Sequence, residues 1–381
     1  MAQEPFGDIP LFREIQRLLA SSGGGPINFE IARQVAAATS RQGPADIPPS
    51  DQQVRVLIDA VRNAEQLVAG YSRIQIDEPT KGAMSTRASW ISASLDGWKW
   101  LLEHLAERFT GELAGMTGDR AEDQMSQVMG QVGPLLLGLQ TGTLIGNLSN
   151  DVLDTTDPPI PRDGEDGFHV VIGNVAAFAS GFDLDIEELI RWLALHGVAY
   201  SLATRSAPWV TRYQRGLLLE LVDAIEIDTG QLEQRLLELQ SGGLEGLEGA
   251  EAIDRSIPVV ETERHRAALD RVRAFVALLE GYSAHIAAEV ESELVEEPAR
   301  LQEGVARHRA SPSEGKAALA SLLGFSSDRE LEAGGRTFCE AIVKLEGLTS
   351  LNRVWDAPDN LPNLTEIRDP FVWIDRVLKQ G

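Results

Sequence analysis

The chain of 381 residues is long enough for one large domain or two ordinary ones, and in either case for a sizeable hydrophobic core. Its formal net charge of −24 repels phosphate backbones and anionic lipid headgroups, which argues against nucleic acid and membrane surfaces as partners. The single cysteine, Cys339, excludes an intramolecular disulfide and supplies too few thiolates for a structural zinc site. The N-terminus lacks the pattern of a signal peptide, so we expect a cytoplasmic protein.

The N-terminal part of the chain predicts short helices joined by flexible linkers. Leu11–Ala20 is amphipathic and ends at a run of serine, glycine and proline residues, which terminate helices. A second helix is expected at Asn28–Thr39. Glycine and proline residues mark Arg41–Ser50 as a linker. Asp51–Ser72 then has apolar residues at intervals of three and four, which indicates a third helix.

A tryptophan-rich segment follows, and Ser85–Phe109 predicts a single helix. It carries Trp90, Trp98 and Trp100. Aromatic residues that recur at helical spacing usually belong to the core of a protein. We therefore interpret the three indoles as packing anchors rather than as a surface that binds a ligand.

The segment Met125–Leu148 is apolar enough to resemble a membrane span, but glutamine and asparagine side chains and the interruption at Pro134 argue against one. Gly138, Gly142 and Gly146 recur every four residues and place a smooth strip along one side of a helix. We expect a buried helix that a neighbouring helix approaches closely.

The pattern changes after this helix. Asp154–Gly167 is rich in proline, aspartate and glycine, which indicates a loop. Phe168–Ile172 is a run of β-branched and aromatic residues bounded by glycines, and it is the best strand signal in the chain. Asp151–Thr155 is the candidate partner strand, so we expect a small sheet at most.

The next helix, Asp185–Thr204, is apolar on nearly all sides, which is typical of a central, buried helix. Asp185 and Glu188 have the spacing of a capping box, and Pro208 ends the element. Further helices are expected at Thr211–Leu239, Glu261–Glu297, Ser313–Leu323 and Glu330–Leu345, with a loop at Ser241–Ile257 and a proline-bearing C-terminal tail. The whole pattern predicts a predominantly α-helical α+β protein.

Within the central helix, His196 and Tyr200 are four residues apart. Four residues turn a helix by about 400°, so both side chains project from the same face. Zinc peptidases use this spacing in the motif H-E-x-x-H, where two histidines bind the ion and the glutamate takes a proton from the metal-bound water. Here Gly197 replaces the glutamate and cannot act as a base. Tyr200 replaces the second histidine, and a phenol stays protonated at neutral pH.

The sequence around this motif resembles a family of zincin-like hydrolases or metallopeptidases of unassigned substrate. The family is of an actinobacterial type and is associated with the biosynthesis of a deazaflavin coenzyme. The similarity includes the Phe168–Ile172 strand and the Gly173–Val175 turn, and it is most specific from Leu193–His196 to the pair Pro208 and Trp209. It extends over most of the chain through Gly7–Arg13, Thr86–Trp90, Leu278–Tyr282 and Val354–Pro362.

This resemblance implies a zincin-like fold, similar to a metalloprotease catalytic domain, with the small sheet beside the motif helix. Residues 81–381 are expected to form that domain, and residues 1–80 an N-terminal helical segment packed into one compact unit with it. Intact relatives bind zinc, and the resemblance makes Glu280 the candidate for a third ligand. We expect a shared pocket formed by Trp192, His196, Tyr200, Trp209 and Glu280.

Because the motif is degenerate, we expect no cofactor, and His196 and Glu280 are the only candidate metal ligands. The protein is expected to be an inactive zincin-like homologue that acts as a binding or scaffold protein for an unidentified protein or peptide. The alternative is a hydrolase that works through a non-standard site in the same cleft. A third possibility is a structural or regulatory helical protein without a small-molecule site.

Overall fold

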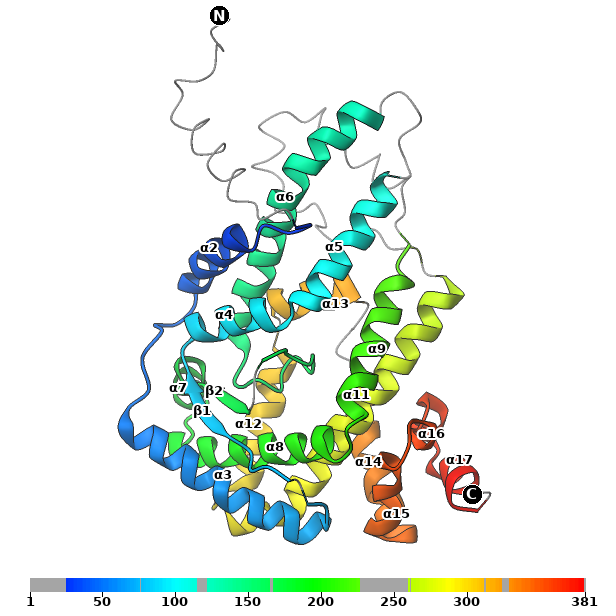
Figure 1. Ribbon diagram of the computed structural model, residues 1–381. Coiled ribbons are helices and arrows are strands. Elements are labelled where there is room, and N and C mark those ends of the chain that lie inside the picture. Colours follow the sequence, from blue (N-terminus) through cyan, green and yellow to red (C-terminus); the bar gives the residue numbers. More distant parts are fainter. Residues whose placement is uncertain are drawn as a thin grey trace, which may run out of the picture.

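The computed structural model describes residues 25–75, 77–114, 122–164, 167–226, 260, 262–311, 313–323 and 329–379. These residues are predominantly helical, and two short strands form one parallel sheet (Figure 1). The predicted fold class is therefore confirmed. The helix expected at Leu11–Ala20 and the loop expected at Ser241–Ile257 lie outside the described residues.

Two N-terminal helices begin at the capping residues that the sequence contains. The helix α2 (Phe29–Thr39) starts after Asn28, whose side-chain oxygen accepts a hydrogen bond from the backbone three residues on. The helix α3 (Asp51–Ser72) starts after Ser50, which forms a reciprocal capping box with Gln53. Such caps satisfy backbone N–H groups that have no partner within the helix. Both predicted helices are confirmed.

The tryptophan-rich region forms two helices, so the single helix predicted there is wrong. The helix α4 (Arg87–Gly97) ends where Trp98 leaves helical geometry, and α5 (Lys99–Ala114) starts directly after it. The buried Trp98 indole donates a hydrogen bond to the carbonyl of Ile160, 3.1 Å away, which ties this corner to a distant loop. Trp90 and Trp98 are 2% and 3% exposed, which confirms their packing role.

The helix α6 (Glu122–Asp151) runs through Pro134, so the predicted interruption is wrong. The carbonyl of Pro134 accepts a hydrogen bond from the backbone of Asn28, which joins α6 to the start of α2. A proline weakens a helix from within, and the contact with α2 offsets that loss. No helix among the described residues is long and apolar enough to cross a membrane.

The three glycines spaced along α6 face α2, as predicted. A methyl group added at Gly138, Gly142 or Gly146 would lie 2.6, 2.5 and 2.6 Å from the nearest atom of α2 or its cap. Real Cβ atoms do not approach their neighbours this closely, so only glycine allows the two backbones to meet here. The two helices accordingly lie side by side in Figure 1.

The sheet pairs two segments that are far apart in the sequence. The strand β1 (Gly82–Ser85) lies parallel to β2 (Phe168–Val171), and Gly82 is opposite Phe168. The predicted partner segment Asp151–Thr155 does pair antiparallel with β2, through a bridge from Asp154 to Val170 and two backbone hydrogen bonds, but it forms no full strand. The sequence Gly-Ala-Met-Ser of β1 lacks the β-branched residues that mark a strand, so tertiary contacts select it.

The motif helix α8 (Ile186–Arg205) follows the short helix α7 (Ile172–Gly181). The Asp185 carboxylate accepts two backbone hydrogen bonds of 2.9 Å at the start of α8. The predicted capping box is not formed, because the Glu188 carboxylate instead accepts from the backbone of Glu296 at 2.7 Å. In Figure 1, α8 crosses the lower part of the molecule and packs against α3 and α11.

The C-terminal half adds α9 (Val210–Asp223), α11 (Glu263–Val290), α12 (Pro298–Ala310), α13 (Glu314–Leu323) and α14 (Arg329–Glu346). Shorter helical elements are Ser40–Gln42, Glu291–Glu293, Leu348–Asn352, Arg353–Trp355, Pro358–Asn360, Leu364–Arg368, Pro370–Trp373 and Ile374–Lys379. The helix predicted at Thr211–Leu239 is not continuous, because α9 ends at Asp223; residues 227–239 lie outside the described residues.

The helix expected at Glu261–Glu297 is also too long, and α12 was not predicted. Acidic side chains repel the negative end of the helix dipole, and a proline favours the first turn of a new helix. The acidic run before Pro298 therefore separates α11 from α12. The predictions for α13 and α14 are confirmed to within one residue.

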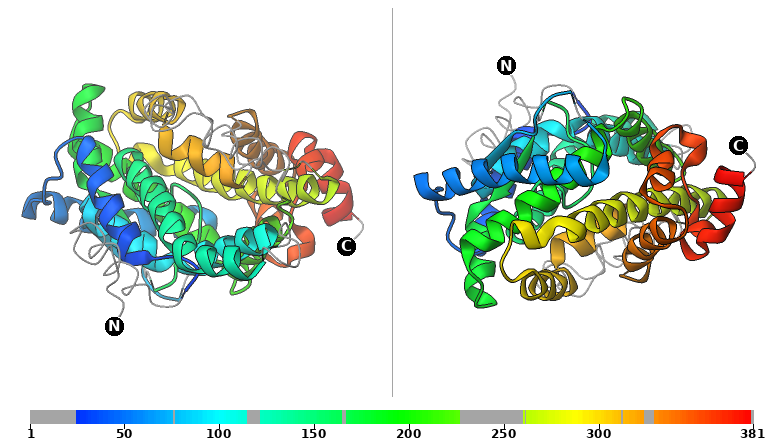
Figure 2. Two further views of the ribbon diagram at one scale, coloured as in Figure 1. Left: turned by 90° about the horizontal axis from the view of Figure 1, so that it is seen from above. Right: turned by 90° about the horizontal axis from the view of Figure 1, so that it is seen from below.

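The long helix α11 runs through the body of the protein with α14 against it (Figure 2). The two backbones touch at Gly281 and Gly335. A Cβ at Gly281 would lie 2.2 Å from the carbonyl carbon of Gly335. Gly281 belongs to the Leu278–Tyr282 block, so part of that block serves helix packing. Cys339 of α14 is fully buried, as expected for a small apolar residue.

Candidate functional site

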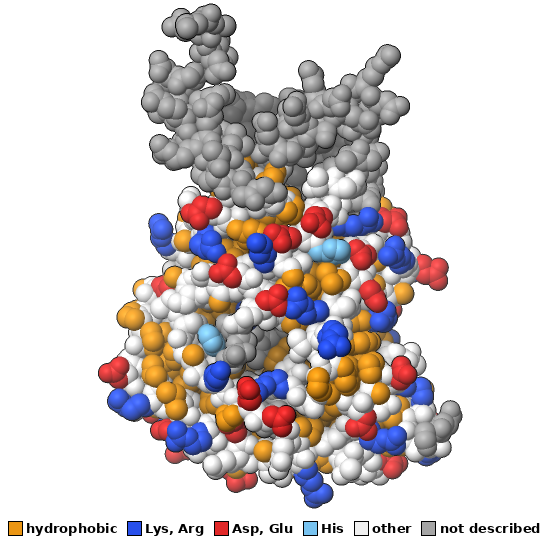
Figure 3. Space-filling view, in the orientation of Figure 1, with side chains coloured by type: hydrophobic (Ala, Val, Ile, Leu, Met, Phe, Trp, Pro, Cys, Tyr) orange, Lys and Arg blue, Asp and Glu red, His pale blue; other side chains and the backbone are white. Residues whose placement is uncertain are grey.

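A cleft of about 350 Å³ opens beside the second half of α8. It is lined by side chains from the segment before β1, the loop before β2, α8 and α9: Glu78, Pro79, Lys81, Thr155, Thr156, Ile160, Pro161, Arg162, Gly167, Phe168, Gly197, Tyr200, Ser201, Thr204, Arg205, Thr211 and Gln214. The space-filling view shows acidic, basic and hydrophobic side chains intermixed over this side of the molecule (Figure 3). Such a cleft joins parts of the chain that are separated by more than a hundred residues.

Gly197, at the position of the zinc-peptidase glutamate, lies under the ring of Phe168. A Cβ at residue 197 would be 2.3, 2.4 and 2.6 Å from Cδ2, Cε2 and Cγ of that ring. Phe168 is 2% exposed, so its ring is held by the core and has little space into which it could turn. The phenyl group therefore occupies the place where the side chain of a general base would begin.

His196, at the first histidine position, is held against another ring of α8. Its imidazole lies over the indole of Trp192, one turn earlier, with ring centroids 3.8 Å apart and planes inclined by 34°. Trp192 is 5% exposed and belongs to the core. The contact between the two ring faces fixes the orientation of the imidazole, as in other aromatic pairs of protein interiors.

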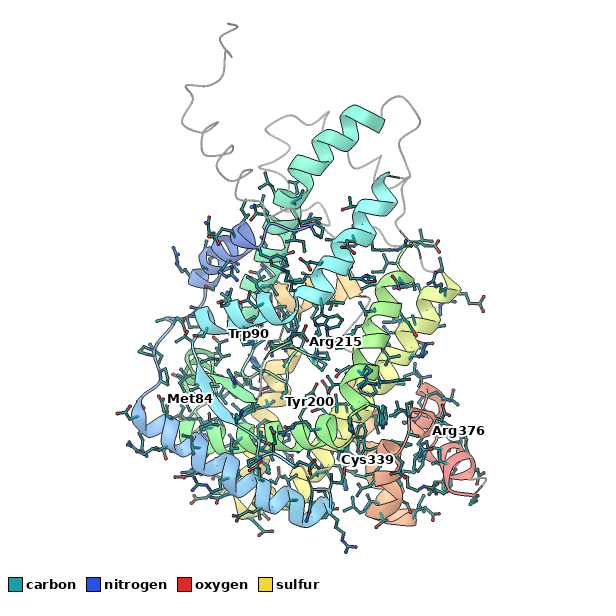
Figure 4. All side chains as sticks on the ribbon, viewed as in Figure 1. Met84, Trp90, Tyr200, Arg215, Cys339 and Arg376 are labelled. Atoms are coloured by element: carbon teal, nitrogen blue, oxygen red, sulfur yellow. The ribbon has the colours of Figure 1, made fainter. Side chains whose placement is uncertain are left out.

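Tyr200, at the second histidine position, reaches the cleft. Figure 4 shows it on the side of α8 that faces Trp90 and Arg215. Burial raises the pKa of the Tyr200 phenol above its ordinary value, and the Glu280 carboxylate raises it further, whereas a hydrogen bond with Gln214 lowers it. The Gln214 side chain is itself held by the carbonyl of Pro159 at 2.7 Å. The phenol is thus kept protonated.

The structure separates the predicted pocket residues into two groups. Gly197 and Tyr200 line the cleft, whereas Trp192, His196, Trp209 and Glu280 do not. Glu280 on α11 nevertheless acts electrostatically on the Tyr200 phenol, which places the two groups near one another across the contact between α8 and α11. A pocket shared by the whole set remains a prediction.

Trp209 connects the start of α9 to the C-terminal part of the chain. It precedes α9, and its indole N–H donates to the carbonyl of Trp355 at 3.1 Å. Its ring also meets Tyr213 edge to face, with centroids 5.8 Å apart. Trp209 therefore ties α9 to the Val354–Pro362 block, and two of the blocks that carry the family resemblance meet through this bond.

The residues at the motif do not fit a zinc ion. Among the described residues, no group of three or more histidine, cysteine, aspartate or glutamate side chains has the geometry of a metal site. At the motif positions of α8 the donors are one imidazole stacked on an indole and one phenol held protonated, and the predicted third ligand is the carboxylate of Glu280 on α11. Catalytic zinc requires three protein ligands, usually histidines or carboxylates, so this donor set is incomplete.

Sequence reasoning missed most of the cleft. Arg162 was interpreted only as part of a loop, yet its guanidinium lies 4.6 Å from the ring centroid of Trp98 and 5.4 Å from that of Trp90. Phe168 was recognised as a strand residue but not as the neighbour of Gly197. The only local signal was Gly197 itself, a glycine inside a buried helix. Such a glycine indicates that another group approaches the backbone closely, but it does not identify that group.

Comparison with known proteins agrees with this architecture. Residues 27–374 match the profile of the family described as zincin-like metallopeptidase, so the chain belongs to that family. A crystal structure from Chloroflexus aurantiacus, described as "a putative hydrolase with a novel fold", superimposes with a TM-score of 0.65 at 23% identity. The match covers 93% of this chain and 100% of that one, and it shows a shared fold. No curated protein matches.

Proposed function

We propose that this zincin-like protein has lost zinc-peptidase chemistry and acts as a binding protein, with the cleft beside α8 receiving a segment of a protein or peptide. The observation that carries the proposal is the ring of Phe168 against Gly197. The ring fills the space that the side chain of a water-activating glutamate at residue 197 would need. Removal of a general base typically lowers a rate by about 10²–10⁴.

The electrostatics of the motif support the same conclusion. Tyrosine binds a metal ion as the phenolate, and burial and the Glu280 carboxylate raise the pKa of the Tyr200 phenol and so hold its proton in place. The net charge of −24 disfavours nucleic acid and anionic membranes, which leaves proteins and peptides in the cytoplasm as the partners that we propose.

The proposal is tested on the full-length protein purified after expression with added zinc. Elemental analysis should give far less than one zinc per chain, and a mixture of peptides should remain uncleaved over a long incubation. Stoichiometric zinc together with peptide cleavage that a chelator abolishes would refute the proposal.

A hydrolase with a different set of residues in the same cleft is the second candidate. It is favoured by the Ser201 hydroxyl, the Tyr200 phenol and the Arg162 guanidinium, which all line this cleft. Cleavage that persists in the presence of a chelator and is lost in Tyr200→Phe or Ser201→Ala would support this candidate instead. Cleavage that survives both substitutions would place the activity elsewhere.

A further inference from the structure

The charges that line the cleft differ in sign from those of the protein as a whole. Among the lining residues that the structure describes, three are cationic, Lys81, Arg162 and Arg205, and one, Glu78, carries a carboxylate. The chain itself carries a net charge of −24. A concave surface with an excess of one sign concentrates ligands of the opposite sign.

The innermost of these cations is held in a defined orientation. The guanidinium of Arg162 lies over the indoles of Trp98 and Trp90, and its Nη1 donates to the carbonyl of Thr155 at 2.9 Å. Its Nη2 donates to the hydroxyl of Ser94 at 3.3 Å. A guanidinium fixed in this way loses little side-chain entropy when it binds an oxyanion.

The other two cations stand at the mouth of the cleft. Arg205 is exposed at the end of α8, and its Nη2 donates to the backbone carbonyl of Glu78 at 2.8 Å. This bond holds the Arg205 side chain across the rim. Lys81 is exposed on the opposite segment, next to β1.

Asp154 is a buried carboxylate in the segment before β2. It accepts hydrogen bonds from the backbone N–H and the hydroxyl of Thr156.

The other described lining residues are uncharged, and they combine apolar side chains, such as Ile160, Pro161 and Phe168, with polar ones. They include the hydroxyls of Thr155, Thr156, Ser201 and Thr211, all of which line the cleft. The volume of about 350 Å³ is near the lower end of the range of about 300–1,000 Å³ that small-ligand pockets occupy. The cleft is therefore suited to a small polar molecule or to the end of a longer chain.

We propose that this cleft binds an oxyanion, a carboxylate or a phosphate, through Arg162, Arg205 and Lys81. Because the inference rests on the binding role proposed above, the carboxylate source that we favour is the free C-terminus of a peptide. The C-terminus combines a terminal charge with amide groups, which the hydroxyls of the walls can contact. Charge-assisted hydrogen bonds from guanidinium to carboxylate or phosphate are the strongest that such a surface offers.

Calorimetric titration of the full-length protein tests the proposal. A panel of N-acetylated tripeptides is compared in two forms, with a free and with an amidated C-terminus, and inorganic phosphate is titrated separately and as a competitor. Peptides with a free carboxylate should bind, their amides should bind at least about fivefold more weakly, and affinity should fall as salt is raised. Binding of phosphate without binding of any peptide would assign the oxyanion site to phosphate-bearing ligands.

Variants at the mouth identify the residues that are responsible. Arg205→Gln and Lys81→Gln should each weaken binding about two- to fivefold, and Glu78→Gln should strengthen it by a similar factor. Arg62→Gln is the matched control, because Arg62 is an exposed cation on α3 outside the cleft. It removes the same charge and should leave affinity unchanged.

The outcomes separate this inference from the proposed function. Equal affinity for free and amidated peptides, or no difference between Arg205→Gln and Arg62→Gln, would overturn the oxyanion site and leave a binding protein with another specificity. Absence of binding by every peptide and by phosphate would overturn both the oxyanion site and a peptide-binding role for this cleft. Neither result depends on the zinc content or the peptidase activity of the protein.

Discussion

At residue 197 the lack of a side chain lets the ring of Phe168 lie directly against the backbone of α8. We predict that Gly197→Ala lowers the free energy of unfolding by about 1–3 kcal/mol, because the new methyl group overlaps a ring that the core holds in place. Without that overlap, alanine would stabilise the helix by about 1 kcal/mol relative to glycine. A loss of stability in Gly197→Ala would therefore indicate the overlap with Phe168. Urea unfolding measures the difference.

Gly216 provides the control for this substitution. It lies inside α9, and a Cβ there would have no neighbour within 4 Å. Gly216→Ala should therefore stabilise the protein by about 0.5–1 kcal/mol. If Gly197→Ala were as stabilising as Gly216→Ala, Phe168 would not occupy the place that the general-base side chain needs.

The phenol of Tyr200 makes stability depend on pH in the alkaline range. Its pKa is raised in the folded protein, so the unfolded chain loses this proton first, and stability present below about pH 10 is lost as pH rises further. The slope is at most about 1.4 kcal/mol per pH unit for this one group. We predict that the free energy of unfolding of the wild type falls relative to that of Tyr200→Phe as the pH rises above about 10. Parallel curves would show that Tyr200 titrates normally.

Zinc binding can be restored in part through the motif positions. Tyr200→His returns a second imidazole to the face of α8 that carries His196, and we predict an increase in zinc affinity of about tenfold or more, measured by competition with a chromophoric chelator. Ser201→His is the control, because it adds the same group about 100° further round the helix. Equal gains in both variants would contradict a vestigial metal centre.

Addition of the missing base needs one more change. A glutamate at residue 197 collides with Phe168, so Gly197→Glu alone should impair folding, and Phe168→Ala should make room for it. The triple variant with Tyr200→His is therefore the appropriate test of restored hydrolysis. Its folded state must be verified by circular dichroism before activity is assessed.

Among the helices, the contact between α2 and α6 depends on glycine. We predict that Gly142→Ala lowers the free energy of unfolding by about 1–3 kcal/mol, because its methyl group would lie 2.5 Å from the carbonyl oxygen of Ala32. Gly133 lies on the same helix, and a Cβ there has no neighbour within 4 Å. Gly133→Ala should leave stability unchanged or raise it. Similar effects at both positions would mean that α2 does not pack on this strip.

The elements that could be predicted are those with local signals. Capping residues and apolar periodicity located α2 and α3, and the spaced glycines indicated the close neighbour of α6. The break at Trp98 and the strand β1 could not be predicted, because a carbonyl from another loop stabilises the first and pairing with β2 selects the second. Contacts between segments that are far apart in the sequence are not reflected in the local pattern of residue types.

For the molecule as a whole, the net charge of −24 destabilises the compact state through self-repulsion. We predict that the thermal midpoint rises by a few degrees when sodium chloride is raised from low to moderate concentration, since salt screens exposed charges beyond about 10 Å at 0.1 M. Differential scanning calorimetry measures the shift. A fall in the midpoint would show that the surface ion pairs outweigh the repulsion.

The sequence by itself determined the predominantly helical class, the central position of α8 and the resemblance to zincin-like proteins, and it predicts a degenerate motif at His196, Gly197 and Tyr200, because each depends on residues that are close together in the chain. Only the tertiary structure decided that Phe168 covers Gly197 and that Arg162, Arg205 and Lys81 line one cleft. These contacts join segments that are distant in the sequence, and their geometry arises when the core packs.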